Sequence, residues 1–257
     1  MQGLTEFIPV SSSAHLVLIP YTTGWPDQGR TIDIAAHLGS LGAVILYFRK
    51  DVAAVLSGAH NLLFSKTHRG SNLFLLLVIG SAPAIVGGAF LILVDETWLR
   101  SLKVIAWATI IGAFALLAAD KYGRNNQSIE NMTYNHALII GMLQILALIP
   151  GASRAGTAIT GALFCGYKRS DAARFSMLLS IPVILAASCY NTFDIVAKGE
   201  GTLTFAAGIT ALLAFTASYG AISFMMKWLD RASYTPFIFY RFLLGGMLFW
   251  WAYLSGT

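Results

Sequence analysis

Two short segments hold the polar side chains that could do chemistry. The first carries Glu6 and His15 on either side of a run of three serines, with Ser12 at its centre. Gln2 lies four residues before Glu6, so on a helix these two side chains share one face. We expect Glu6, Ser12 and His15 to converge, which brings together a carboxylate, a hydroxyl and an imidazole. These groups serve as base and nucleophile in hydrolytic reactions.

The second segment, residues 150–157, reads Pro-Gly-Ala-Ser-Arg-Ala-Gly-Thr. Glycines allow the backbone to approach a ligand closely, and the free N–H groups of a following helix attract anions. Serine and threonine hydroxyls add donors, and the planar guanidinium of Arg154 suits phosphate oxygens. The segment is therefore a candidate phosphate cradle, formed by Gly151, Ser153, Arg154, Gly156 and Thr157.

A purely structural interpretation of the same residues stays open at this point. Glu6 could simply pair with Arg154, and the serines could cap a half-helix. A carboxylate at membrane depth costs at least a few kcal/mol, and it persists where it serves a site or a partner. Because His15 and three serines accompany Glu6, we favour the functional interpretation.

The composition bounds the class of protein. The chain has 257 residues, 56% hydrophobic and 11% charged, and its mean hydropathy is +0.68. Soluble domains average about 25% charged residues, and so few charges cannot cover a soluble globule of this size. The composition predicts an integral membrane protein and excludes a disordered chain, a coiled coil and a soluble two-domain enzyme. The net charge is +5, and the charged residues lie in short loops between apolar runs. This pattern indicates a membrane protein and no nucleic-acid partner.

The elements that position these residues are predicted to be helices. A helix that spans a bilayer needs about 20 apolar residues. About six segments meet this need: 32–48, 73–94, 104–119, 175–193, 203–226 and 237–254. Residues 51–64 predict an amphipathic helix at the membrane surface.

Two further apolar stretches, 3–20 and 137–166, are interrupted by the polar segments described above. Each predicts two half-helices joined by a break, which is a re-entrant hairpin. Non-helical backbone at membrane depth is tolerated only inside protein or beside a water-filled cavity, and such breaks usually line a site. The predicted fold is an all-α polytopic membrane protein with about six transmembrane helices and two re-entrant hairpins.

Loop charges predict the orientation. With both hairpins entering and leaving on one side, four loops on one face hold eleven Lys and Arg, and three loops on the other hold four. The positive-inside bias places the first face in the cytoplasm. The hairpins then enter from opposite sides, as in an inverted-topology repeat. Residues 1–257 form one membrane domain with halves at about 1–119 and 137–257, joined by the loop 120–136.

A short sequence match supports this repeat. Ile8-Pro9 followed by Ser12 matches Ile149-Pro150 followed by Ser153, at an offset of 141.

Other polar residues weigh less. We expect His37, on an apolar face, to make a structural hydrogen bond. Arg174 either reaches the site or extends to the membrane interface. Arg241 either pairs with a site carboxylate or extends to the membrane interface. Three histidines are expected in solvated loops: His60, His68 and His136.

The two segments together resemble a known family. QGLTEFIPVSSSAH and PGASRAG look like the two signature motifs of the undecaprenyl-diphosphate phosphatases of the bacitracin-resistance type, and flanking stretches such as AAHLGSLGAVILYFRKD and TPFIFYRF are similar too. The resemblance implies an inverted repeat with two re-entrant hairpins. It implies hydrolysis of undecaprenyl diphosphate to undecaprenyl phosphate at the outer face of the bacterial plasma (inner) membrane, facing the periplasm. This reaction recycles the carrier lipid of peptidoglycan synthesis, and such proteins confer bacitracin resistance.

The resemblance also implies residue roles. Gln2 and Glu6 stand at the family's acidic pair, which binds a divalent cation, Mg²⁺ or Ca²⁺. The catalytic residues would be Glu6, Ser12, His15 and Arg154, with either Ser12 or water as the attacking group and either His15 or Glu6 as base. The diphosphate would be bound by Ser11, Ser13, Gly151, Ser153, Arg154, Gly156 and Thr157.

The chain departs from the family pattern at a few positions. Alanine replaces a common glycine at position 14 and a usual serine at 155, and the threonine of the second motif is shifted by one place, with Ala158 following Thr157. Met1 directly precedes the first motif, whereas family members have a short helical lead, so a shortened N-terminus is expected.

A transporter or flippase for a phosphorylated polyprenyl lipid is the main alternative, because broken helices in inverted repeats are typical of secondary transporters. Such a carrier has little need of His15 beside Glu6. A type-2 phosphatidic-acid phosphatase is excluded, because no histidine follows Arg154. The expected partners are the polyprenyl diphosphate, the bilayer and, as a homodimer, a second copy of the chain.

Overall fold

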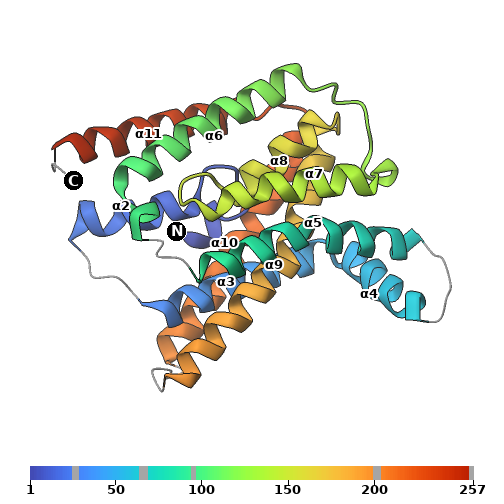
Figure 1. Ribbon diagram of the computed structural model, residues 1–257, viewed down its shortest axis with the longest axis horizontal. Coiled ribbons are helices and arrows are strands. Elements are labelled where there is room, and N and C mark those ends of the chain that lie inside the picture. Colours follow the sequence, from blue (N-terminus) through green and yellow to red (C-terminus); the bar gives the residue numbers. More distant parts are fainter. Residues whose placement is uncertain (25–28, 64–68, 94–96, 199–203, 255–257) are drawn as a thin grey trace.

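The computed structural model describes residues 1–24, 29–63, 69–93, 97–198 and 204–254. Within these ranges the regular structure is helical, apart from an isolated bridge between Gln127 and Tyr167. Five of the described helices are each long and apolar enough to cross a membrane, and one bent helix pair can supply a sixth span. The prediction of an all-α polytopic membrane protein is confirmed (Figure 1).

The six long helices each overlap one of the six predicted spans. They are α3 (Arg30–Tyr47), α5 (Arg69–Leu91), α6 (Leu102–Tyr122), α9 (Arg169–Ala197), α10 (Phe205–Leu229) and α11 (Thr235–Leu254). The predicted ends at 94 and 203 lie outside the described residues. α9 extends beyond the predicted 175–193 because its charged ends have partners; Arg169 Nε, for example, donates to Asp120 Oδ1 at 2.5 Å.

The predicted amphipathic helix is α4 (Arg49–Leu63), which follows α3 at a bend of 89°. It packs against α5, beside which it lies at one end of the molecule (Figure 1). The two backbones touch at a pair of glycines: a Cβ on Gly58 would lie 2.2 Å from the carbonyl carbon of Gly70. Only glycine fits this contact, which fixes where α4 crosses α5.

Both interrupted segments form two arms joined by a turn, as predicted. The first consists of α1 (Gln2–Thr5) and α2 (Ser12–Thr23). The second consists of α7 (Tyr134–Gln144), the 3₁₀ helix η3 (Ile145–Leu148) and α8 (Arg154–Phe164). Two further 3₁₀ helices, η1 (Thr97–Arg100) and η2 (Ile129–Asn131), connect other elements.

A serine with left-handed backbone stands before the second arm of each hairpin. Ser11, with φ of 71°, precedes α2, and Ser153, with φ of 69°, precedes α8. Each serine oxygen accepts a hydrogen bond from the N–H three residues later, Ala14 at 3.4 Å and Gly156 at 3.1 Å. These N-caps satisfy an otherwise unpaired donor and help to hold a strained conformation that side chains rarely adopt.

The two caps correct the register of the sequence repeat. The sequence match pairs Ser12 with Ser153 at an offset of 141, whereas the structure pairs Ser11 with Ser153, at 142. The difference arises because the second turn holds one more residue between its proline and its cap. Ser12 and Arg154, the first residues of α2 and α8, are therefore the true counterparts.

Helix contacts are exchanged between the halves as a repeat requires. α1 packs on α10 while α7 packs on α5, and α3 packs on α10 while α9 packs on α5. The pairs α3–α9 and α6–α11 join the halves directly, and Figure 1 shows α6 and α11 side by side. This exchange supports the predicted repeat, whose division at loop 120–136 stays a prediction.

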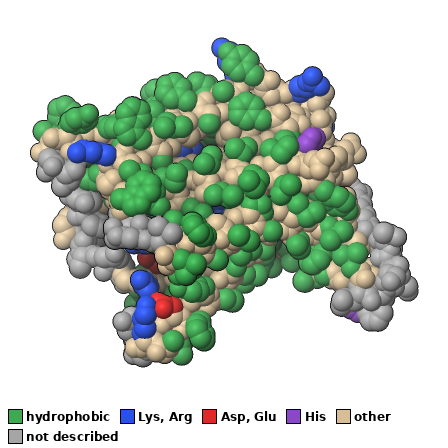
Figure 2. All heavy atoms as spheres, viewed as in Figure 1, with side chains coloured by type: hydrophobic (Ala, Val, Ile, Leu, Met, Phe, Trp, Pro, Cys, Tyr) green, Lys and Arg blue, Asp and Glu red, His purple; other side chains and the backbone are tan. Residues whose placement is uncertain are grey.

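Large apolar side chains cover much of the outside of the bundle. Trp107, Phe114, Leu212 and Trp250 are among those with more than half of their surface exposed. Figure 2 shows hydrophobic side chains across the visible face, with Lys and Arg mainly near its edges. Such a surface suits lipid rather than water, so the helices form a multi-pass membrane protein.

The close contact between α3 and α10 can be tested with a pair of glycines. A Cβ on Gly39 would lie 2.1 Å from the Ala211 carbonyl oxygen, whereas one on Gly220 meets nothing within 4 Å. We expect Gly39→Ala to cost about 1–3 kcal/mol and to lower the unfolding temperature in detergent by several degrees. Gly220→Ala is the matched control and should leave it unchanged or raise it. Equal effects of the two substitutions would contradict this packing.

Candidate active site

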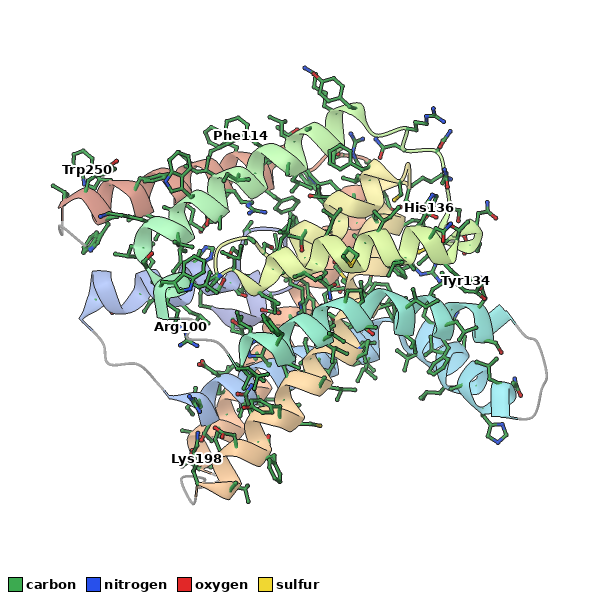
Figure 3. The ribbon with its side chains drawn as sticks, viewed as in Figure 1. Arg100, Phe114, Tyr134, His136, Lys198 and Trp250 are labelled. Atoms are coloured by element: carbon green, nitrogen blue, oxygen red, sulfur yellow. The ribbon has the colours of Figure 1, made fainter. Side chains whose placement is uncertain are left out.

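A cavity of about 930 Å³ lies where the two hairpins meet α3, α5 and α9. Five of the predicted site residues line it: Glu6, Ser12, Ser13, Ser153 and Arg154. Its exposed rim carries Arg30, Arg100 and Lys198. Figure 3 shows Arg100 and Lys198 toward one end of the molecule, with Tyr134 and His136 at the other.

Glu6 is the centre of the polar cluster. Its Oε2 accepts hydrogen bonds from Gln2 Nε2 at 2.6 Å and from Ser12 Oγ at 2.7 Å. Its Oε1 accepts from Nη2 of Arg154 in an ion pair that joins the two hairpins. The carboxylate is only 7% exposed and the guanidinium 17%, so the pair is shielded from bulk water yet open to the cavity. The structural interpretation, a Glu6–Arg154 pair, and the functional one thus involve the same contact.

Ser12 and Glu6 have the geometry of a nucleophile and its base. The hydroxyl hydrogen of Ser12 is directed at the carboxylate, within the distance over which a proton can transfer. Arg154 lies beside both groups, where it can bind an anion placed in the cavity.

Ser13 links the hairpins. Its Oγ accepts a hydrogen bond from the N–H of Gly151 at 3.1 Å. Ser13 also lines the cavity, so it remains a candidate ligand of an anion there.

Four predicted phosphate ligands do not line the cavity. Ser11 is buried as the cap before α2, and the N–H groups of Gly151 and Gly156 are occupied by Ser13 and Ser153. The Thr157 hydroxyl donates to the Arg154 carbonyl within its own helix. These residues shape the turns, and Ser153 and Arg154 are the part of the second motif that faces the cavity. Ala155, where the family usually has serine, lies in the buried core and does not line the cavity.

His15 does not converge with Glu6 and Ser12. Its Nδ1 donates to the Ser11 carbonyl at 2.7 Å, and its Nε2 faces the Tyr240 hydroxyl at 2.6 Å. The imidazole also stacks on the Tyr240 ring at 5.5 Å between centroids. The reason is a tertiary contact: the His15 side chain is held by Tyr240 of α11, outside both hairpins. Glu6 is then the base candidate that the geometry favours.

A different histidine lines the cavity. His37, on α3, has its Nε2 2.9 Å from Gln2 Nε2 and its Nδ1 2.8 Å from the Asp33 carbonyl oxygen. The expected hydrogen bond is confirmed, but sequence reasoning missed the position of His37 in the cavity wall. The signal was present as a polar cluster, His37 and Ser40 around Gly39, within an apolar helix.

Arg241 plays neither of its expected roles. It is fully buried, and its Nη2 donates to the carbonyls of Gly151 at 3.2 Å and Ala152 at 3.0 Å. Among the described residues, no carboxylate pairs with it, and its Nε and Nη1 have no hydrogen-bond partner. Arg241 therefore holds the break of the second hairpin from behind.

The remaining expectations concern residues away from the cavity. Arg174 does not reach the site, because it pairs with Asp51 and lies 3.6 Å from Glu130. His136 is not in a loop: it stands in the first turn of α7 with its Nδ1 2.8 Å from the Tyr167 hydroxyl. His60 is exposed on α4, and His68 lies outside the described residues.

The donor set at Glu6 fits a hard divalent cation that takes most of its ligands from a substrate. No group of three His, Cys, Asp or Glu side chains that could hold a metal occurs in the described part of the chain. However, Gln2 Oε1 is buried without a hydrogen-bond partner among the described residues, in the same side chain whose Nε2 donates to the Glu6 carboxylate. Mg²⁺ is commonly bound through one or two carboxylates plus substrate phosphates. An amide oxygen and one carboxylate suit that mode.

The ion pair between the hairpins can be tested by a double-mutant cycle on stability. Arg154→Met leaves the Glu6 carboxylate buried without its cation, which is costly. In the Glu6→Gln background that charge is absent, so Arg154→Met should destabilise the protein less there than it does in the wild type. We expect a coupling of about 1–3 kcal/mol, measured as unfolding temperatures in detergent. Additive effects of the two substitutions would show that the pair does not hold the hairpins together.

Comparisons with known proteins identify the family. The model of the family described as bacitracin resistance protein BacA matches residues 1–247. The undecaprenyl-diphosphatase of Dinoroseobacter shibae is 44% identical over 255 residues, covering 98% of this chain and 96% of the relative. That of Chromohalobacter salexigens is 44% identical over 259 residues, covering 98% and 95%, and that of a Jannaschia species is 41% identical over 255 residues, covering 98% and 96%. The chain belongs to the bacitracin resistance protein BacA family.

Proposed function

We propose that this protein is an undecaprenyl-diphosphatase, which hydrolyses undecaprenyl diphosphate to undecaprenyl phosphate and inorganic phosphate. The observation that carries the proposal is the cluster of Ser12, Glu6 and Arg154, assembled from two hairpins in a cavity within a membrane protein. It combines a hydroxyl nucleophile, a base and a phosphate-binding cation. The names of the relatives support the substrate.

Arg154 binds the diphosphate by exchanging partners. Without substrate its guanidinium is held by Glu6, which keeps it in a defined position. A diphosphate carries more negative charge than one carboxylate and offers oxygens at the spacing of a guanidinium fork. When the terminal phosphate takes over Arg154, the Glu6 oxygen that held the arginine is released. Ser153, at the N-terminus of α8, adds a hydroxyl and the positive end of the helix dipole.

Glu6 then serves as base for Ser12. The Ser12 oxygen attacks the terminal phosphorus, its proton passes to Glu6, and undecaprenyl phosphate departs. Water then cleaves the phosphoserine and releases inorganic phosphate. The 2.7 Å contact between Ser12 Oγ and Glu6 Oε2 supports these roles for the two residues, and the contact of His15 with Tyr240 favours Glu6 over His15 as the base.

A divalent cation, Mg²⁺ or Ca²⁺, is part of the proposal. Glu6 and the free oxygen of Gln2 would hold it. Bound there, it would neutralise charge on the phosphate oxygens as the P–O bond breaks, which is a main source of rate in phosphoryl transfer.

The walls of the cavity suit the lipid tail. The α5 and α9 sides are lined mainly by small and aliphatic residues, including Ala84, Ile85, Gly88, Val183 and Ile184. The charged head group can therefore lie at the hairpins while the first isoprene units rest against these helices. The rest of the tail needs only the surrounding bilayer.

The position of the rim supports an active site that faces the outside of the plasma membrane, the periplasm. Arg30, Arg100 and Lys198 come from the three loops that are poor in Lys and Arg. The positive-inside rule assigns those loops to the outer face. At that face the reaction would return the carrier lipid to cell-wall synthesis. A transporter for a phosphorylated lipid gains no support, since the compared relatives named above are diphosphatases.

Phosphate release tests the activity. Purified protein should release phosphate from undecaprenyl diphosphate in detergent, and EDTA should abolish the release. Glu6→Ala and Arg154→Ala should each lower kcat/KM by at least about 100-fold, because each removes a group that contacts the reacting phosphate. Arg231→Ala, at an exposed position outside the cavity, is the control. Wild-type turnover in either site variant would show that the site is misassigned, and full activity in EDTA would exclude the cation.

The identity of the nucleophile can be tested by trapping. With the terminal phosphate radiolabelled, acid quenching during turnover should leave label on the wild-type protein and none on Ser12→Ala. Ser223→Ala, at a half-buried serine of α10 that does not line the cavity, should keep the label. Fast turnover without any labelled protein, and with Ser12→Ala retaining most of the activity, would point to attack by water instead.

A further inference from the structure

The environment of His37 fixes its tautomer. Nδ1 lies 2.8 Å from the carbonyl oxygen of Asp33, one turn earlier on α3. Because a carbonyl oxygen only accepts, Nδ1 carries the hydrogen and donates it. In the neutral imidazole, Nε2 is then an acceptor. It points at the side-chain amide of Gln2.

This acceptor in turn fixes the orientation of the Gln2 amide. Nε2 of Gln2 lies 2.9 Å from His37 Nε2 and 2.6 Å from Glu6 Oε2. Both neighbours accept, so only the NH₂ group of the amide can occupy this place. Oε1 must point the other way, and it is buried without a partner among the described residues. A single chain of hydrogen bonds thus connects the α3 backbone, His37, Gln2 and Glu6.

We propose that His37 is a positioning residue of the active site, which acts through Gln2. It holds the Gln2 amide with its oxygen free for the cation and its NH₂ group on the Glu6 carboxylate. The inference rests on the proposed function, because the cation and the reaction are those proposed above. It extends the site to α3, outside both hairpin motifs.

Glutamine at position 2 gives this second acceptor a role. A carboxylate presents oxygen on either side, whereas an amide turned by half a rotation would present NH₂ to a cation and repel it. With His37 present, the NH₂ group donates to two acceptors, and the amide oxygen has no hydrogen-bond donor among the described residues. Without His37, one of these two hydrogen bonds is lost, and the amide is held in this orientation by Glu6 alone. Partners that orient metal ligands in this way typically change metal affinity or activity by 10–100-fold when they are removed.

The test is a cycle of four proteins: wild type, His37→Leu, Gln2→Ala and the double variant. Kinetics with undecaprenyl diphosphate give kcat, KM and the Mg²⁺ concentration for half-maximal rate. A Ca²⁺ titration of the unfolding temperature in detergent, without substrate, gives a binding readout that does not depend on turnover. His37→Gln is the conservative rescue, since its amide oxygen can accept from Gln2, and His60→Gln on α4 is the control.

We expect His37→Leu to raise the half-maximal Mg²⁺ and Ca²⁺ concentrations by about tenfold or more, with KM for the lipid changed less than kcat. His37→Gln should recover most of this loss, and His60→Gln should match wild type. Since His37 acts through Gln2, His37→Leu should have no further effect in the Gln2→Ala background. Independent, additive effects, or a loss of stability without a change in cation response, would overturn the inference.

Failure of the inference and failure of the proposed function give different results. If wild type releases phosphate and His37→Leu responds to cations as wild type does, the inference is wrong and the function stands. If wild type releases no phosphate, the proposed function is wrong. The Ca²⁺ titration still decides the inference in that case: a shift in wild type that weakens in His37→Leu supports it, and equal or absent shifts overturn it.

Discussion

The contact between Glu6 and Arg154 is the interaction on which the site depends. It joins two residues that are 148 positions apart in the chain, one in each hairpin, and it places a carboxylate and a guanidinium in one cavity. A buried ion pair contributes little net stability, because desolvation offsets much of the attraction. Its role here is to position the two charged groups. Each charge is held where a diphosphate and a cation can displace it, so the empty site is already arranged for the substrate.

The surrounding structure keeps these two groups at the ends of interrupted helices. Ser11 and Ser153 adopt left-handed backbone conformations that only their capping bonds and the packing around them make tolerable. Behind the second turn, Arg241 donates to two backbone carbonyls. A buried guanidinium with unpaired nitrogens is expensive, and it is retained where it positions a functional segment. The strained backbone of both breaks and the incompletely paired guanidinium of Arg241 therefore all lie around the site.

Local sequence patterns predicted most of the fold but only part of the site. Apolar runs located the six long helices, and the polar interruptions located both hairpins. The sequence placed His15 in the cluster because it stands in the same polar segment as Glu6 and Ser12, yet the direction of its side chain depends on Tyr240 of α11, which is far away in the sequence. His37 was missed for the same reason, since its partner Gln2 lies 35 residues away. The register of the repeat was wrong by one residue because turn length cannot be read from a short match.

The most direct test of this account is a structure of the protein with a non-hydrolysable methylene diphosphonate analogue of undecaprenyl diphosphate. We expect Arg154 to leave Glu6 and bind the terminal phosphonate, while Ser12 stays on the Glu6 carboxylate and faces the terminal phosphorus. A structure in which the diphosphonate lies away from the hairpins, with Arg154 still paired to Glu6, would contradict it.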